Sequence, residues 1–388
     1  MKVGLTATMI QGGRSGVAQY VFSLVRELVR AGRVDLTVFV LEDEMPHFDF
    51  VREQCRIISV PQAAAPPVKN ILWHQFTLPK LAAKLGLDVL HVPSYRRLVF
   101  DGPCPTVGTI HDLAPFHVRG KYDFARMFYG RVVVKTLARR QNEIIAVSHC
   151  TALDIERFFG IPRTRQHVIH NGIDHDRFFP GDIEAARAWT SEKHGLQAPY
   201  FLYVSRLEHP GKNHVRLIEA FVDFKKATGS DWQLALGGGD WHGCEAIKSA
   251  AAASPFATDI RFLGFVPDAD LPNLYRAARG MVYPSLFEGF GLPPVEAMAC
   301  GTPVISSTRG ALGEVVGDAA LIVDPEDVPD ITRALTALST DSDLADSLRS
   351  KGLANAARFH WKNTAAEVTE IYRTASTDSR PREQSNIN

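Results

Sequence analysis

The sequence predicts an α/β protein with two doubly wound, Rossmann-like domains that face each other across a cleft. Short β-rich runs alternate with longer segments of helical periodicity, which is the pattern of βαβ units around a parallel sheet. This pattern occurs twice, on either side of a polar stretch at Pro180–Pro199. The chain has 388 residues, whereas single hydrophobic cores stop growing at roughly 250–300 residues.

The first domain is predicted over residues 1–180. Its clearest element is a helix at Val17–Arg30, where apolar residues recur at helical spacing after a glycine-rich turn and Gly32 supplies the stop. The segment Pro61–Val68 is rich in Ala and Pro and is predicted to be a mobile loop. Strands are predicted at Val3–Thr8, Leu36–Leu41, Arg56–Val60, Val89–Val92, Val107–Ile110, Ile144–Val147 and Val168–Ile169.

The second domain is predicted over residues 181–375, with a last helix that is able to pack back on the first domain. The polar tail at 376–388 is predicted to be disordered. Ligands of open parallel sheets bind beyond the carboxyl ends of the strands, so we expect the functional residues in the loops that follow strands. Strands are predicted at Tyr200–Val204, Gln233–Leu236, Ile260–Leu263, Met281–Tyr283, Pro303–Ser306 and Ala320–Val323.

The composition restricts the partners and the compartment. The formal net charge is zero and no nucleic-acid-binding signature appears, so a nucleic-acid partner is disfavoured. The N-terminus lacks a signal-peptide pattern, and no window approaches the roughly 18 apolar residues of a membrane span. We therefore expect a soluble, cytoplasmic protein. Neither a disulfide scaffold nor structural zinc is expected, because no C-x-x-C pair occurs among Cys55, Cys104, Cys150, Cys244 and Cys300.

Charge is divided unevenly along the chain. Residues 1–180 carry 23 Lys and Arg against 16 Asp and Glu, whereas residues 181–388 carry 20 against 27. Much of the first excess lies at 119–140, where basic residues are mixed with apolar ones. Two interpretations stay open: an interfacial helix at the inner face of the plasma membrane, and an ordinary amphipathic helix that packs on the core.

The most informative motif follows the last residues of the predicted strand at Met281–Tyr283. It reads S-L-F-E-G-F-G-L-P-P-V-E-A-M-A-C-G, a loop with two glycines and then a helix that begins at a Pro-Pro pair. Glu288 lies in the loop and Glu296 in the first turn of the helix, so both carboxylates can accept hydrogen bonds from one polyhydroxylated ligand. The alternative for Glu296 is stabilisation of the helix dipole, worth ~0.3–1 kcal/mol.

A second motif, V-S-R-L-E-H-P-G-K-N, follows the predicted strand at Tyr200–Val204. Its two cations, Arg206 and Lys212, flank a Pro-Gly turn that leads into a helix, so they can converge with the helix N-terminus on one anion. A diphosphate fits this arrangement. Solvated surface charges are the alternative.

The two motifs resemble those of the retaining nucleotide-sugar glycosyltransferases of the fourth sequence family, which have the GT-B fold. The resemblance rests on the Glu288-x7-Glu296 pattern with G-F-G-L-P-P and E-A-M-A-C-G-T-P-V-I, and on the Arg206-x5-Lys212 pair. It covers most of the second domain and, more weakly, the whole chain. Asn213 departs from the family, which more often has Gly there. The stretch at 304–325 is similar to mannosyl- and rhamnosyltransferases of bacterial surface polysaccharides.

The resemblance also assigns three glycines near the N-terminus and a loop in the second domain. Gly12, Gly13 and Gly16 resemble the glycine loop that lies across the cleft from the sugar diphosphate, although a plain tight turn would have the same composition. The family places the nucleobase near Gly264 and Phe265, where a loop that simply packs on the core is the other interpretation.

His111 and Asp112 end the predicted strand at Val107–Ile110 and point to the same cleft. The pair resembles the active-site histidine of the family, which contacts the donor sugar near the acceptor, with Asp112 orienting the loop. A structural histidine satisfied by hydrogen bonds is the alternative. Ser148 occupies a similar strand end, and the N-G-I-D segment at 171–174 is similar to the interdomain turn of the family.

The expected activity is transfer of a hexose from a nucleotide sugar, GDP-mannose or a UDP-sugar, to a hydroxyl of a glycan or lipid-linked saccharide. Arg206 and Lys212 would stabilise the departing diphosphate, and Glu296 would bind the ribose. Glu288 would hold the sugar hydroxyls together with the loop formed by Gly289, Phe290, Gly291 and Leu292. The resemblance implies retention of anomeric configuration.

No cofactor and no catalytic metal are expected, because Arg206 and Lys212 already provide the positive charge. D-x-D pairs occur at 174–176, 268–270 and 341–343, and none follows a strand in a glycine-rich context. Two other functions stay open. A nucleotide-sugar epimerase would release an epimerised sugar nucleotide without an acceptor, and a non-catalytic binding protein would bind the nucleotide without transfer.

Overall fold

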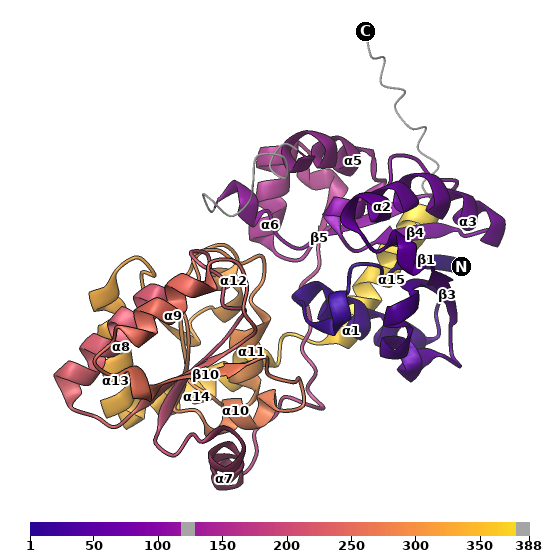
Figure 1. The fold of residues 1–388 in the computed structure, drawn as a ribbon. Helices are drawn as coiled ribbons and strands as arrows, with labels where there is room; N and C mark the ends of the chain where they lie inside the picture. The colour runs from indigo at the N-terminus through magenta and orange to yellow at the C-terminus, as the bar shows by residue number, and fades with distance from the viewer. Residues whose placement is uncertain (118–128, 378–388) are drawn as a thin grey trace. The chain divides into compact units, whose positions relative to one another are not determined.

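The computed structural model describes residues 1–117 and 129–377 (Figure 1). The chain forms two compact units. Of the described residues, the first unit comprises 1–113, 129–172 and 361–377, and the second comprises 114–117 and 173–360. Of the tail predicted to be disordered, only Ser376 and Thr377 are described, and both lie in the last helix.

The first unit is built on a seven-stranded parallel sheet with the order β3-β2-β1-β4-β5-β6-β7. The order changes direction between β1 and β4, which pair in parallel. Beyond the carboxyl ends of such a pair, the loops diverge to opposite faces of the sheet and leave a crevice that commonly binds ligands. The strands are β1 (Lys2–Thr6), β2 (Asp35–Leu41), β3 (Arg56–Val60), β4 (Val89–Val92), β5 (Thr106–Ile110), β6 (Glu143–Ala146) and β7 (Gln166–Val168).

Helices cover both faces of this sheet. In α1, the Ser15 side chain accepts a hydrogen bond from the Ala18 amide at the start, and Gly32 ends the helix with φ 62°. The last helix of the chain, α15, packs beside α1 (Figure 1). The described α-helices are α1 (Gly16–Ala31), α2 (Pro67–Leu72), α3 (Leu78–Leu85), α5 (Lys135–Arg140), α6 (His149–Asp154) and α15 (Trp361–Thr377).

A buried polar contact ties α15 to the sheet. His91 on β4 lies 2.7 Å from the Tyr372 hydroxyl of α15 through Nδ1 and 2.8 Å from the Thr109 hydroxyl of β5 through Nε2. Burial lowers the pKa of His91 to about 3, so the ring is neutral at ordinary pH and has one N–H and one acceptor nitrogen for the two hydroxyls. The helix α15 therefore completes the core of the first unit.

The segment Pro61–Val68 differs from the predicted mobile loop. It contains a 3₁₀ turn at Gln62–Ala64 and the start of α2. Pro67 stands at the first position of α2, where its fixed φ suits a helix and its missing N–H costs no hydrogen bond. The prolines therefore start a helix here instead of keeping the segment open.

The second unit is built on a six-stranded parallel sheet with the order β10-β9-β8-β11-β12-β13. Here the order changes direction between β8 and β11. The strands are β8 (Tyr200–Val204), β9 (Gln233–Gly237), β10 (Ile260–Gly264), β11 (Gly280–Tyr283), β12 (Val304–Ser306) and β13 (Ala320–Ile322). The helices are α7 (Ile183–His194), α8 (His214–Thr228), α9 (Cys244–Ala252), α10 (Leu271–Ala277), α11 (Leu292–Ala299), α12 (Leu312–Val316), α13 (Val328–Thr340) and α14 (Ser342–Ala356).

The fold class is confirmed: both sheets are parallel and alternate with helices. Each of the thirteen strands in the described ranges coincides with a predicted strand, and the ends differ by two residues at most. The five cysteines, all of which lie in the described ranges, form no disulfide with one another. No helix in the described ranges is both long and apolar enough to cross a lipid bilayer.

Candidate active site

An ion pair bridges the point where the strand order of the second sheet changes. Lys212 comes from the loop after β8, and Glu288 comes from the loop after the neighbouring strand β11. Lys212 Nζ donates to Glu288 Oε1 at 2.5 Å, and Ser285 Oγ donates to the same oxygen at 2.6 Å. Both charged side chains are only 14% exposed. A cation and an acid of complementary charge therefore occupy the crevice where this fold binds ligands.

The backbone of Lys212 is fixed on both sides. Its N–H donates to the Glu208 carbonyl at 3.3 Å, and its carbonyl accepts from the buried Tyr203 hydroxyl at 2.6 Å. Its ammonium lies 6.0 Å from the centroid of the Tyr283 ring. The loop therefore presents the ammonium from a rigid base on β8 and β11, and the flexible part of Lys212 is confined to its side chain.

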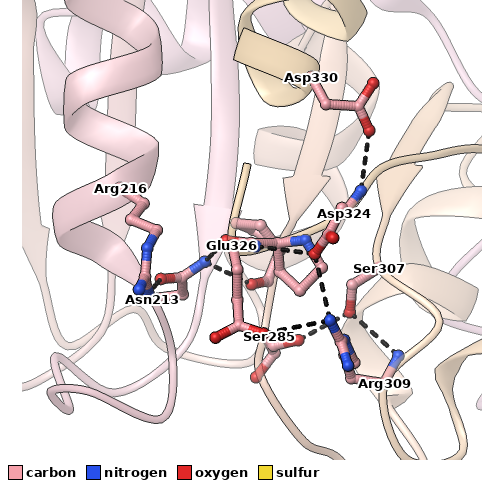
Figure 2. A network of polar contacts seen from close by, with 10 residues as sticks. Asn213, Arg216, Ser285, Ser307, Arg309, Asp324, Glu326 and Asp330 are labelled. Carbon is pink, nitrogen blue, oxygen red and sulfur yellow. Dashed lines mark hydrogen bonds and ion pairs between the residues drawn. The ribbon is translucent and has the colours of Figure 1, made fainter. Parts of the chain in front are cut away.

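Asn213 explains why the turn tolerates a residue other than Gly. It starts α8 with φ 62°, a left-handed conformation that Asn adopts more readily than most residues. Its side-chain amide donates to the carbonyls of Pro284 at 3.0 Å and Pro325 at 2.6 Å, and its carbonyl oxygen accepts from Arg216 at 2.9 Å (Figure 2). The Asn213 side chain thus connects its own loop to the loops that contain Pro284 and Pro325.

The same network extends over the loops after β12 and β13 (Figure 2). Ser307 Oγ donates to the Ser285 carbonyl at 2.7 Å and accepts from the Arg309 amide at 3.3 Å. The Arg309 guanidinium pairs with Asp324 and Glu326, each at 3.2 Å. Since Ser285 itself bonds to Glu288, these contacts position the ion pair indirectly.

Gly310 allows the backbone of Glu288 to approach closely. The two residues form an isolated parallel bridge, and the Ala311 amide donates to the Glu288 carbonyl at 2.8 Å. A Cβ atom on Gly310 would lie 2.2 Å from that carbonyl oxygen, and its φ is 67°. Neither Gly310 nor Ser285 was among the residues predicted to have a role. The available signals were a glycine shortly after a strand and a serine three residues before Glu288.

Arg206 lies on the same loop as Lys212 but has different partners. Its side chain is 42% exposed and pairs with the buried Glu208 carboxylate at 3.6 Å. Its guanidinium carbon lies 4.6 Å from the centroid of the Trp241 ring. The aromatic contact and the acid hold the guanidinium beside the loop, so the positive charge is preorganised at the carboxyl edge of the sheet.

Glu296 is not in the first turn of its helix, so this detail of the prediction is wrong. The helix α11 begins at Leu292, directly after Gly291 with φ 99°, and Glu296 is therefore its fifth residue. Its carboxylate accepts a hydrogen bond from the Tyr275 hydroxyl at 3.1 Å. Burial raises the pKa of Glu296 to about 7, against the opposing effect of Arg177. Stabilisation of the α11 dipole no longer explains this residue, because the effect is confined to the first turn.

The raised pKa of Glu296 makes the stability of the second unit depend on pH. The folded pKa of about 7 lies above the ordinary value of 4.5, so stability is lost as pH rises through this interval. We expect Glu296→Gln, which does not titrate, to gain up to about 3 kcal/mol relative to the parent between pH 4.5 and pH 8. Chemical denaturation of both proteins at pH 4.5 and pH 8 measures the free energies of unfolding. If the variant and the parent differ by the same amount at both pH values, the pKa of Glu296 is not raised in the folded protein.

The rest of the predicted donor loop is buried around α11. Gly289 and Phe290 are buried, and the Phe290 ring meets Phe359 edge-on at 5.6 Å. Leu292 is the first residue of α11, and Gly291 adopts a conformation that favours glycine. Burial and backbone conformation thus both restrain this loop.

The predicted nucleobase site lies at the end of β10. Gly264 has φ 65°, and its carbonyl accepts from the Gly238 amide at 2.7 Å. Phe265 is 50% exposed. Stacking of a planar base on the exposed part of this ring stays a prediction.

The predicted glycine loop of the first unit follows β1. Gly12 and Gly13 have φ values of 68° and 77°, whereas Gly16 is simply the first residue of α1. The Gly12 amide donates to Glu44 Oε1 at 2.8 Å. The positive φ values agree with a tight turn, and a carboxylate, itself an anion, accepts from one amide of that turn.

His111 is half-buried at the end of β5. Its Nε2 lies 3.1 Å from the Pro93 carbonyl, and its ring meets Tyr20 edge-on at 4.8 Å. Burial lowers the pKa of His111, against the effect of the adjacent Asp112. Since a carbonyl only accepts, Nε2 carries the proton of the neutral ring, and Nδ1 is a hydrogen-bond acceptor. Catalytic contact by His111 stays a prediction.

Ser148 has a structural role, because its hydroxyl accepts from the Thr151 amide and caps α6.

The three D-x-D pairs have structural partners. Asp174 accepts from the Asp176 amide at 3.1 Å, Asp268 pairs with Arg177 at 3.4 Å, and Asp270 pairs with Lys193 at 2.7 Å. Within the third pair, Asp341 caps α14 by accepting from the Leu344 amide. Four of the six acids therefore have a partner within the protein.

The basic segment at 119–140 falls partly outside the described residues. In its described part, α5 buries Leu137 and Ala138, and Arg140 lies over the Phe100 ring at 3.9 Å. Val132 and Val133 are exposed. The described part of the segment thus packs on the first unit, and membrane contact stays a prediction.

Both halves of the chain match models of glycosyltransferase families. Residues 14–177 match the model described as glycosyltransferase family 4, and residues 189–373 match glycosyl transferases group 1. O-antigen chain mannosyltransferase B of Escherichia coli is 32% identical over 287 residues, which covers 72% of this chain and 75% of that protein.

Solved structures support the same fold. Sucrose-phosphate synthase from Thermosynechococcus elongatus aligns with a TM-score of 0.79 at 22% identity, covering 96% of this chain and 98% of that one. Anabaena HepE in complex with UDP-glucose aligns with a TM-score of 0.78 at 19% identity, covering 96% and 100%. The chain therefore belongs to the group 1 glycosyl transferases, glycosyltransferase family 4, and is a glycosyltransferase with the GT-B fold.

Proposed function

We propose that this glycosyltransferase is a retaining enzyme that transfers mannose from a nucleoside-diphosphate sugar to a hydroxyl of a glycan or lipid-linked acceptor in surface-polysaccharide synthesis. The Lys212–Glu288 pair at the crevice of the second sheet is the observation that carries the proposal. The name of the Escherichia coli mannosyltransferase supports mannose, and the UDP-glucose complex of Anabaena HepE supports a nucleotide-sugar donor.

The ion pair suggests how donor binding prepares the site. A diphosphate competes with Glu288 for the Lys212 ammonium, because both are anionic oxygen ligands of a cation. Once Lys212 turns to the diphosphate, Glu288 Oε1 keeps the hydrogen bond from Ser285 and gains capacity for a hydroxyl of the sugar. Arg206 adds a second positive charge from the same loop, and Glu296 binds the ribose.

Sugar transfer passes through an oxocarbenium-like transition state while negative charge builds on the departing diphosphate. Lys212, once it has turned to the diphosphate, and Arg206 stabilise that charge electrostatically. No side chain is assigned as a covalent nucleophile. The leaving phosphate deprotonates the acceptor hydroxyl from the same face of the sugar, and this gives retention.

Transfer assays with GDP-mannose, UDP-glucose and other nucleotide sugars test the proposal. We expect one donor to raise the melting temperature and to transfer its sugar to a mannoside acceptor with its anomeric configuration kept, as read by NMR of the product. An inverted product would contradict retention. Epimerised nucleotide sugar formed without acceptor would indicate an epimerase, and binding without transfer or hydrolysis would indicate a non-catalytic protein.

A further inference from the structure

The first sheet also has a crevice, and a buried arginine lies at it. The strand order changes direction between β1 and β4. Thr8 follows β1, and Arg97 ends the 3₁₀ turn Tyr95–Arg97 that follows β4. The helix α2 supplies Asn70, whose side-chain oxygen accepts from Arg97 Nε at 2.7 Å and lies 3.5 Å from the Thr8 hydroxyl. Residues from three elements thus meet beyond the carboxyl ends of β1 and β4.

Arg97 is buried without an acid. It is 6% exposed, and its second hydrogen bond goes from Nη1 to the Arg96 carbonyl at 3.1 Å. Among residues 1–117 and 129–377, no Asp or Glu side chain pairs with it. Burying a guanidinium is costly unless an anion compensates it. The two hydrogen bonds use two of its five N–H groups, so the fork retains donors for a further oxygen ligand.

Two fully buried polar groups beside Arg97 also lack partners. Asn70 Nδ2 and His74 Nε2 have no hydrogen bond in the described part of the chain, and both side chains are 0% exposed. Asn70 Nδ2 is a donor on the same carboxamide that contacts Arg97. His74 Nδ1 lies 2.8 Å from the backbone carbonyl oxygen of Asn70. Since a carbonyl only accepts, Nδ1 carries the proton of the neutral ring, and Nε2 is an unprotonated acceptor. Unsatisfied buried groups of this kind are rare and require an explanation.

We propose that Arg97, Asn70 and His74 form a subsite for a phosphate group on the acceptor, with Arg97 and the Asn70 amide donating to the phosphate oxygens and His74 Nε2 accepting from a neighbouring hydroxyl. A phosphorylated or diphosphate-linked saccharide has this combination of oxyanion and hydroxyl. The assignment to the acceptor rests on the proposed function, in which the donor diphosphate binds to Arg206 and Lys212 of the second sheet.

The sharpest test is Asn70→Asp in the full chain. The new carboxylate would pair with Arg97, compensate its charge and compete with phosphate. We measure the rise in melting temperature caused by inorganic phosphate at constant ionic strength, in an Arg206→Ala/Lys212→Ala background that removes the expected donor site. We expect the background protein to bind phosphate, and the added Asn70→Asp to weaken binding at least tenfold without lowering the melting temperature in chloride.

Two further variants distinguish the geometry of the Arg97 guanidinium from a general effect of positive charge. Arg97→Lys keeps the charge but loses the two-pronged geometry, so we expect at least tenfold weaker phosphate binding even if Asn70→Asp fails to fold. Arg96→Gln is the matched control, because Arg96 bonds to the Tyr95 hydroxyl instead, and we expect less than a twofold change. Unchanged phosphate affinity in Asn70→Asp or Arg97→Lys, or an equal loss in Arg96→Gln, would overturn the subsite.

An activity arm separates the subsite from the proposed function. In the otherwise unchanged enzyme, Asn70→Asp should raise KM at least tenfold for a mannoside 6-phosphate acceptor and leave KM for the neutral methyl mannoside within twofold. If Asn70→Asp transfers sugar but changes KM for the two acceptors by the same factor, or changes neither KM, the subsite is overturned. Phosphate binding that depends on Arg97 in a protein that transfers to no acceptor would instead contradict the proposed function alone.

Discussion

Replacing Lys212 with Met should lower kcat/KM for sugar transfer about a thousandfold. The substitution removes a largely buried cation from the crevice, and one preorganised group that stabilises developing negative charge is worth about 10²–10³ in rate. It also leaves the Glu288 carboxylate with Ser285 but without its ion-pair partner. Steady-state kinetics with the preferred donor measures the loss, and circular dichroism establishes that the variant is folded.

Glu288→Gln and the double variant show whether the pair acts as a unit. Each single change should be severe, and the double variant should lose much less than the product of the two, because the residues contact each other. Lys226→Met is the control, since it breaks an exposed ion pair with Asp223 on α8 and should change kcat/KM less than twofold. Near-normal kcat/KM in Lys212→Met would remove Lys212 from the catalytic machinery.

Gly310→Ala should displace the Glu288 loop. The added Cβ would lie 2.2 Å from the Glu288 carbonyl oxygen and 2.8 Å from its amide nitrogen, and the φ of 67° disfavours any side chain. Backbone atoms on both sides have little freedom to move, so we expect a loss of about 3 kcal/mol or more in the free energy of unfolding. The shift of the Glu288 carboxylate should lower kcat/KM about a hundredfold in the folded fraction.

Gly239→Ala is the matched control for Gly310→Ala. Gly239 lies in the loop after β9, and a Cβ there would meet no atom within 4 Å. We expect its unfolding free energy to stay within about 0.5 kcal/mol of the parent. Chemical denaturation of both variants makes the comparison. If the two variants have the same free energy of unfolding, the Glu288 loop accommodates the added Cβ without loss of stability, and the prediction is wrong.

Much of the fold follows from local patterns. Alternation of β-rich and helical segments predicts every described strand, because buried parallel strands are short apolar runs bounded by turn residues. The error at Pro61–Val68 is also physical: Pro disfavours a helix interior but favours its first position, and only the residues that follow distinguish the two. The position of α15 beside α1 is a long-range contact that periodicity does not encode.

The site was predictable as a set of strand ends but not as a set of contacts. The sequence places Lys212 after one strand and Glu288 after another, and only the strand order makes these neighbours. Sequence reasoning assigned them to different parts of one ligand, whereas the structure pairs them with each other. Arg97, Asn70 and His74 come from segments up to 27 residues apart and form no motif. Their significance depends on burial, which a sequence does not show.

The return of α15 to the first unit has a consequence for biosynthesis. The core of that unit includes Trp361, Val368 and Tyr372, which a ribosome adds only after the whole of the second unit. During translation, the part of the first unit that precedes residue 173 therefore keeps an uncovered apolar face until α15 has been synthesised. The second unit can fold earlier, because most of its residues form one continuous segment, 173–360. A premature stop codon near position 360 should consequently yield an insoluble product, even though every proposed active-site residue has been translated.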